Sequence, residues 1–190
     1  MVWNLPLLLT WLRIVAIPLI IVLFAIGRRN PAGLGDTAAG LVFALAAITD
    51  SLDGYLARRL GLITPLGAFL DPVADKLIVA MALVLLVSRD PRLLIVLTAI
   101  VIIGREIAIS ALREWMAELG HRTKVAVSAL GKYKTIVQMV GLSLMLYRHD
   151  LFDLPMYWLG QWLTVAAAVL TLVSMFIYLR AALPYLRQRS

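Results

Sequence analysis

Residues 37–57, TAAGLVFALAAITDSLDGYLA, contain no charged side chain from Thr37 to Thr49 and then carry two aspartates, Asp50 and Asp53. A helix that crosses the hydrocarbon core of a bilayer takes about 20 residues, which is the length of this stretch. A carboxylate at membrane depth costs at least about 2.5 to 3.5 kcal/mol on insertion scales, so it is a functional candidate by default. The stretch therefore predicts a membrane helix that carries a candidate functional site at Asp50 and Asp53.

Five more apolar stretches surround this one, separated by charged residues, glycine or proline. Of the 190 residues, 62% are hydrophobic, against about 45 to 50% in soluble domains. We therefore expect an all-α integral membrane protein with six transmembrane helices in a single domain, residues 1–190. The six stretches are 5–26, 37–57, 70–88, 93–115, 125–147 and 156–183. The first has no basic start and contains Arg13, so we interpret it as a retained span rather than a signal peptide.

The charge of the chain points to anionic lipids or anionic substrates. Eighteen Lys and Arg against 11 Asp and Glu give a net charge of +7, and little sequence lies outside the apolar stretches. No soluble module is left to form a nucleic-acid-binding fold, so we expect no nucleic acid partner. The chain has no cysteine, which excludes disulfides, thiolate metal sites and cysteine nucleophiles.

The basic residues between the stretches also predict the topology. Arg28, Arg29, Arg89, Arg92 and Arg148 fall on one side of the membrane, and ten Lys and Arg fall on the other side or at the C-terminal end. By the positive-inside rule, both termini and the second set of connections face the cytoplasm.

Four aspartates lie on two adjacent predicted helices with helical spacing. The first helix carries residues at i, i+3, i+4, i+7 and i+8, and the second carries residues at i, i+4 and i+8, so each set lines one face. The first set is Asp50, Asp53, Gly54, Ala57 and Arg58; the second is Gly67, Asp71 and Asp75. Two helices joined by a short connection would present four carboxylates to one another.

Four carboxylates in a medium of low dielectric repel one another unless positive charge is supplied, and Arg58 and Lys76 are the cations close in sequence. Bound divalent cations would remove this repulsion, and carboxylate oxygens are suitable ligands for Mg²⁺ or Mn²⁺. Two such ions would be consistent with phosphoryl chemistry. Taken singly, Gly54 fits helix packing, Arg58 fits a side chain that reaches the interface, and one aspartate fits a proton relay. The combination on two helices favours a site.

The same residues match the pattern D-x2-D-G-x2-A-R-x8-G-x3-D-x3-D at every specified position, which is the signature of the CDP-alcohol phosphotransferase family. The resemblance extends along nearly the whole chain, through Asn4-Leu5-Pro6, Thr10, Arg13, the segment 105–120 and the segment 131–135. It implies six membrane helices around a polar cavity that faces the cytoplasm, usually in a homodimer. These later segments resemble the bacterial, inner-membrane branch that uses CDP-diacylglycerol and sn-glycerol 3-phosphate.

The resemblance also implies roles for individual residues. Asp50, Asp53, Asp71 and Asp75 would bind the metals, and Asp75 would double as the general base. The cytidine diphosphate part of the lipid would contact Gly54, Arg58 and Thr64. The products would be phosphatidylglycerophosphate and CMP.

A second cationic pocket is needed for the phosphate of the acceptor. The candidates are Arg105, Arg113, Lys132 and Lys134, of which Arg113 also fits a solvated loop residue. We favour Arg105, Lys132 and Lys134. Because adjacent residues point to different faces of a helix, we expect Arg105 and Glu106 each to find another partner.

Two other interpretations stay open. The same metal site could serve another acceptor, such as serine, inositol phosphate or a phospholipid. Alternatively, the four carboxylates could form the ion path of a divalent-cation transporter, although transporters commonly repeat such features in both halves and here all four lie between Asp50 and Asp75.

Overall fold

The structure, a computed structural model, is all-helical in the part of the chain that it describes, which is residues 5–30, 34–60, 65–118 and 129–187. Side chains are not described for residues 5–7, 51–60, 65, 68, 113, 117, 129–132, 178 and 181–187. The six helices are α1 (Leu5–Arg29), α2 (Gly35–Leu60), α3 (Pro65–Arg89), α4 (Leu93–Glu118), α5 (Ala129–Tyr147) and α6 (Met156–Arg187). Each matches a predicted stretch. The third helix begins earlier than expected, with Pro65 in its first turn. Proline is favoured at this position because an N–H group there would have no partner within the helix.

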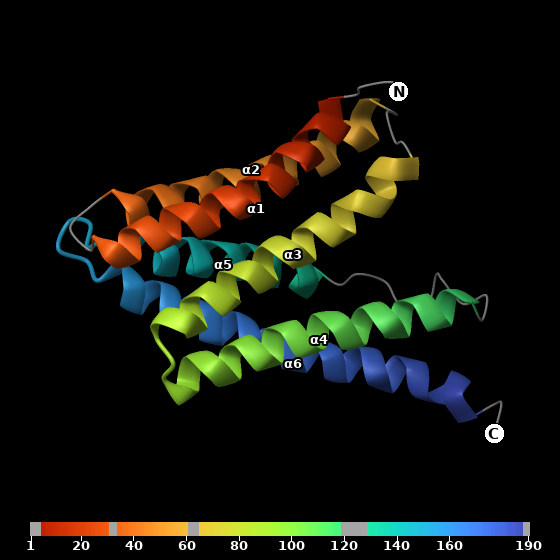
Figure 1. Cartoon of the computed structure of the whole chain (residues 1–190). Helices are drawn as coiled ribbons and strands as arrows, with labels where there is room; N and C mark the ends of the chain where they lie inside the picture. The colour runs from red at the N-terminus through yellow and green to blue at the C-terminus, as the bar shows by residue number, and fades with distance from the viewer. Residues whose placement is uncertain (1–4, 31–33, 61–64, 119–128, 188–190) are drawn as a thin grey trace.

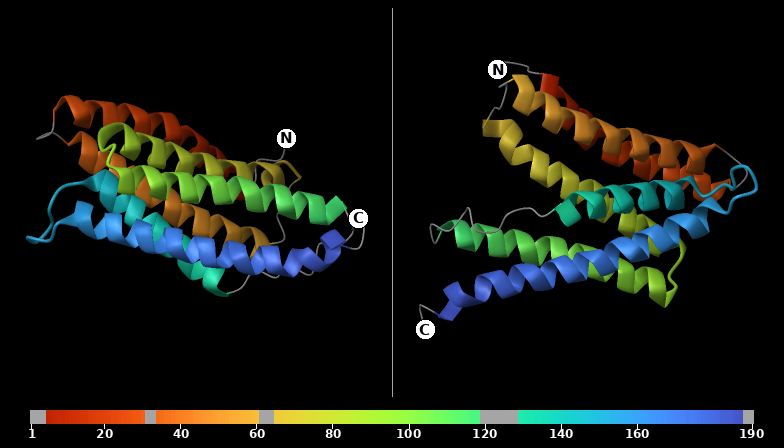
Figure 2. Two further views of the ribbon diagram at one scale, coloured as in Figure 1. Left: turned by 90° about the horizontal axis from the view of Figure 1, so that it is seen from below. Right: turned by 180° about the vertical axis from the view of Figure 1, so that it is seen from behind.

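The helices pack in a closed ring (Figures 1 and 2). Contacts run from α1 to α2, then to α5, α6, α4 and α3, and from α3 back to α1. A further contact joins α3 to α5 across the ring. Because the helices alternate in direction, the start of α1, the end of α2 and the start of α3 meet at one end, which we call the site end.

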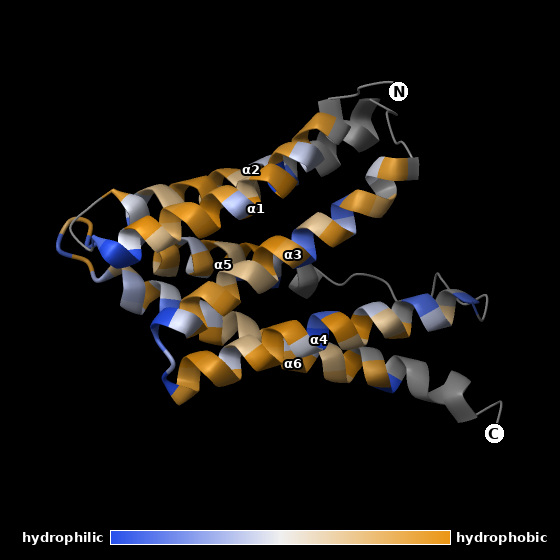
Figure 3. Cartoon of the chain, viewed as in Figure 1, coloured by the Kyte–Doolittle hydropathy of each residue, from blue (hydrophilic) through white to orange (hydrophobic). Residues whose placement is uncertain are grey.

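Polarity in this bundle differs from that in a soluble protein. Large apolar side chains face outward, as with Ile107, which is 65% exposed, and apolar residues make up most of the described helices in Figure 3. The interior is mainly apolar but also contains polar side chains, among them Arg13 at 1% exposure. An apolar exterior around polar interior groups is what a bilayer requires.

Three of the helices are long and apolar enough to cross a membrane among the residues that could be assessed: Leu8–Arg29, Leu93–Met116 and Met156–Ile177. Together with the apolar exterior, they make this a membrane protein. The helix α3 is as long as α1 but carries Asp71, Asp75 and Lys76, which lower its apolar character. The polar residues of this helix are the ones that the sequence assigns to the site.

Two glycines let α5 and α6 approach closely. A Cβ atom added to Gly141 would lie 2.5 Å from Oγ1 of Thr164, and one added to Gly160 would lie 2.6 Å from the carbonyl oxygen of Gly141. Small residues at such crossings bring helix backbones into van der Waals contact, which is the main source of association between helices in lipid.

A buried ion pair joins α2 to α3 at the end opposite the site. The guanidinium of Arg89 lies 2.5 Å from Asp36, which is almost completely buried, and 5.4 Å from the ring centroid of Phe24. Both charged groups are therefore compensated inside the bundle.

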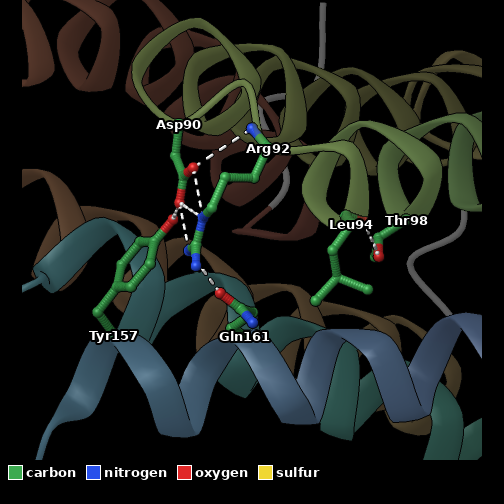
Figure 4. A network of polar contacts seen from close by, with 6 residues as sticks. All are labelled: Asp90, Arg92, Leu94, Thr98, Tyr157 and Gln161. Carbon is green, nitrogen blue, oxygen red and sulfur yellow. Dashed lines mark hydrogen bonds and ion pairs between the residues drawn. The ribbon is translucent and has the colours of Figure 1, made fainter.

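A second polar network at this opposite end ties the α3–α4 connection to α6 (Figure 4). Arg92 donates several hydrogen bonds to Asp90, the shortest from Nε at 2.8 Å and from Nη2 at 2.6 Å, and Nη2 also lies 2.7 Å from Oε1 of Gln161. The hydroxyl of Tyr157 donates to the same carboxylate. Hydrogen bonds from Arg92 lower the pKa of Asp90 from 3.8 to about 2.

Replacing Gly160 by alanine should destabilise the bundle by about 1 to 3 kcal/mol, because the new methyl group meets backbone atoms that cannot move aside. Gly104→Ala is the matched control, since nothing lies within 4 Å of a Cβ atom there and alanine is the better helix former. Thermal unfolding in detergent measures both. Equal melting temperatures for the two variants would contradict the close crossing.

The lowered pKa of Asp90 predicts a pH dependence of stability. Because the folded-state pKa lies below the ordinary value, the ionised carboxylate stabilises the fold fully above pH 3.8, and this contribution is lost as the pH falls toward about 2. Between these pH values the wild-type protein should lose more stability than Asp90→Asn, which has no carboxylate to protonate. Acid unfolding measures the difference. Asp150→Asn, which alters an exposed residue of the α5–α6 connection, should follow the wild type.

Candidate active site

The first helix supplies the partners of three of the predicted aspartates. Nη1 of Arg13 lies 2.8 Å from Oδ1 of Asp50 and also donates to Oδ1 of Asp75. One turn earlier, Oγ1 of Thr10 donates to Oδ1 of Asp71 at 2.5 Å. Both donors are buried, and because they are three residues apart they share one face of α1.

Three helices therefore meet at one guanidinium. Arg13 comes from α1, Asp50 from α2 and Asp75 from α3. Since one nitrogen atom contacts both carboxylates, the two aspartates lie close together, as their spacing in the sequence predicts. Asp71 lies one helical turn before Asp75 and is fixed by Thr10.

The structure adds a source of positive charge that the spacing of the aspartates did not indicate. Arg13, which is far from Asp50 and Asp75 in sequence, contacts both, whereas the side chain of Arg58 is not described. Lys76 donates to Oγ of Ser110 on α4. A signal for Arg13 did exist in the sequence, because a charged residue inside an apolar span has to find a partner within the bundle.

A cavity of about 270 Å³ opens beside the aspartates. It is bounded by four helices, α2 to α5. Asp50 and Asp75 lie on one side of it with exposed fractions of 27% and 42%, so their carboxylates are accessible from the cavity. The lining residues are Asp50, Pro72, Asp75, Lys76, Val79, Arg105, Glu106, Ile109, Ser110, Thr135, Gln138 and Met139.

A basic cluster from α4 and α5 lies at the same cavity, which Arg105 lines and which Lys134 approaches through its contact with Glu106. Nη1 of Arg105 lies 2.6 Å from Oε1 of Glu106, and Nζ of Lys134 lies 3.4 Å from the same oxygen. Nη2 of Arg105 donates to Oγ of Ser174 on α6 at 3.2 Å. The structure thus brings together Arg105 and Lys134, two of the three residues predicted to hold the acceptor phosphate.

As expected, Arg105 and Glu106 each have another partner, Ser174 and Lys134 respectively, but the two residues also pair with each other, which their spacing did not predict. Their Cα–Cβ bonds do point to different faces of α4, but both side chains are long enough to bend toward each other beside the cavity. Their contact also places a carboxylate next to Arg105 and Lys134. The net charge of this cluster is therefore +1 and not +2.

Several predicted site residues lie outside what the structure describes. Thr64 falls in the undescribed segment 61–64. Asp53, Gly54 and Arg58 belong to α2, and Lys132 to α5, but their side chains are not described. Their predicted roles therefore stay predictions.

The carboxylates at this end of the bundle are the candidate ligands of a divalent metal. Among the side chains that the structure describes, no three carboxylates or imidazoles gather closely enough to hold an ion by themselves, and the predicted fourth ligand, Asp53, is not among them. The chemistry nevertheless fits Mg²⁺ or Mn²⁺. The donors are carboxylate oxygens. Because Asp50 and Asp75 lie close together, they repel each other unless positive charge is near them.

Comparison with known proteins identifies the family of the chain. The model of the CDP-alcohol phosphatidyltransferase family matches residues 3–174. Proteins named CDP-diacylglycerol–glycerol-3-phosphate 3-phosphatidyltransferase from Escherichia coli (strain K12), Shigella flexneri and Salmonella choleraesuis (strain SC-B67) are 48% identical over 182 residues. The matched region covers 96% of this chain and 96% of each relative. The conserved length and the family match lead to one conclusion: this chain is a member of the CDP-alcohol phosphatidyltransferase family and a transferase.

Proposed function

We propose that this protein transfers the phosphatidyl group of CDP-diacylglycerol to the free primary hydroxyl of sn-glycerol 3-phosphate, which yields phosphatidylglycerophosphate and CMP. The observation that carries the proposal is the cavity of about 270 Å³, which has Asp50 and Asp75 on one side and the Arg105 cluster beside them. A carboxylate pair and a cationic cluster in one cavity suit a reaction between two phosphate-bearing molecules. Relatives that match nearly the whole chain are named for this reaction.

The proposed setting is the inner membrane of a bacterium. We propose that all six helices cross the bilayer as one domain, with both termini and the site end in the cytoplasm, and that two chains form a homodimer. The apolar exterior of the bundle and the excess of basic residues in the connections at the site end support the membrane arrangement, and the homodimer follows from the resemblance to the family. The water-soluble acceptor would then reach the cavity from the cytoplasm.

Asp50, Asp53, Asp71 and Asp75 would hold one or two divalent cations, Mg²⁺ or Mn²⁺. When bound, such ions neutralise the pyrophosphate and stabilise CMP as the leaving group. Gly54, Arg58 and Thr64 would contact the cytidine diphosphate moiety at the end of α2 and in the connection that follows.

Asp75 is the proposed general base. Its carboxylate lines the cavity and is partly exposed to it, so an acceptor hydroxyl could reach it there. It would take the proton from the acceptor hydroxyl while the hydroxyl oxygen bonds to the lipid-linked phosphorus. The bond between that phosphorus and the oxygen of CMP breaks in the same displacement.

Arg105, Lys132 and Lys134 would hold the phosphate of the acceptor. Arg105 is prepared for this task, because Glu106 and Ser174 fix its guanidinium in a buried position before any ligand arrives. Guanidinium groups bind phosphate through paired hydrogen bonds, and the nearby lysines add charge. The glycerol end of the acceptor would then extend toward Asp75.

An acceptor panel tests the proposed substrate. Purified protein with CDP-diacylglycerol and Mg²⁺ or Mn²⁺ should release CMP with sn-glycerol 3-phosphate and little or none with serine, inositol phosphate or phosphatidylglycerol. CMP release with one of these other acceptors alone would assign the same chemistry to another alcohol. Metal uptake into liposomes without any CMP formation would favour a transporter instead.

Asparagine substitutions should separate the roles of two aspartates. Asp75→Asn should abolish turnover but leave much of the CDP-lipid binding, because the base is lost while the other carboxylates remain. Asp50→Asn should weaken metal binding itself. Turnover is measured as CMP release and binding with radiolabelled CDP-diacylglycerol. Turnover of Asp75→Asn near the wild-type rate would show that another group is the base.

A further inference from the structure

Thr10 and Arg13 stand behind the aspartates and not inside the cavity. Neither residue lines the cavity, and both are almost completely buried. Asp50 and Asp75 do line it, and each directs one carboxylate oxygen, Oδ1, to Arg13. The aspartates therefore have one face toward α1 and another toward the open space.

Charge and hydrogen-bonding capacity define how Thr10 and Arg13 can act on the aspartates. A carboxylate has two oxygens and about four acceptor positions, so a bond to α1 leaves capacity for a cation on the cavity side. Arg13 joins Asp50 of α2 to Asp75 of α3 and offsets part of their repulsion. Thr10 fixes Asp71 through a neutral hydroxyl.

We propose that Thr10 and Arg13 are positioning residues for the proposed metal site: they orient the carboxylates of Asp71, Asp50 and Asp75 from the α1 side, so that the remaining oxygens are available to divalent cations. The inference rests on the proposed function, because it requires that the aspartates bind metal. Groups that hydrogen-bond to metal ligands commonly contribute about 10- to 100-fold in metal affinity.

Two outcomes are physically distinct for Arg13. If it orients the carboxylates, its removal weakens metal binding, since Asp50 and Asp75 then repel each other and separate. If instead it occupies the position of the cation, its removal strengthens metal binding. The burial of Arg13 on the α1 side, away from the cavity, favours the first outcome.

The experiment measures Mn²⁺ binding by electron paramagnetic resonance with chelator-treated full-length protein in detergent, without substrate. Arg13→Gln should raise the dissociation constant by about 10- to 100-fold. Arg89→Gln is the matched control, because it removes another buried arginine that pairs with an aspartate, at the end opposite the site, and its affinity should stay within about twofold of wild type.

Thr10→Val keeps the inference testable if Arg13→Gln does not fold. Valine preserves the shape of threonine but removes the hydroxyl, so Mn²⁺ affinity should fall by about tenfold, and Thr10→Ser should restore it. In an Asp71→Asn background, Thr10→Val should cause no further loss, because its partner is already altered.

The results separate this inference from the proposed function. Unchanged or tighter Mn²⁺ binding in both Arg13→Gln and Thr10→Val, with normal binding by the wild type, overturns the positioning role alone. A wild-type protein that does not bind Mn²⁺ overturns the proposed metal site. An equal loss in Arg89→Gln and Arg13→Gln would assign the effect to general destabilisation and would also overturn the inference.

Discussion

The contact between the Arg13 guanidinium and the carboxylates of Asp50 and Asp75 is the interaction on which the rest of the site end depends. A buried charge without a partner is far more costly than a paired one, so the buried guanidinium of Arg13 requires the two carboxylates. The contact holds α1, α2 and α3 in register. It also sets the two carboxylates side by side at the edge of the cavity, where their chemistry is proposed to take place.

The apolar exterior explains why so few interactions control the arrangement. In lipid, burial of apolar side chains provides little driving force between helices, and close packing and polar contacts take its place. The bundle uses both. Gly141 and Gly160 bring α5 and α6 together, whereas Asp36–Arg89 and the Asp90 network secure the end opposite the site.

The two ends of the bundle use arginine–aspartate pairs differently. At the opposite end, the Asp36–Arg89 pair is closed off by the bundle, and Asp90 is bonded by Arg92 and Tyr157. At the site end, the aspartates keep an accessible side toward the cavity. A charge that is satisfied on one side and accessible on the other is what distinguishes a binding position from a structural ion pair.

The amino-acid sequence was enough to predict the six helices and the proximity of Asp50 and Asp75, because apolar length and helical spacing are local properties of the chain. It also identified Arg105 and Lys134 as members of one basic cluster. Local spacing could not reveal that Arg13 is the counter-charge, that Glu106 bends toward Arg105, or that Tyr157 closes on Asp90. These contacts join helices that are distant in sequence or depend on the bending of long side chains, so only the packing of the six helices decided them.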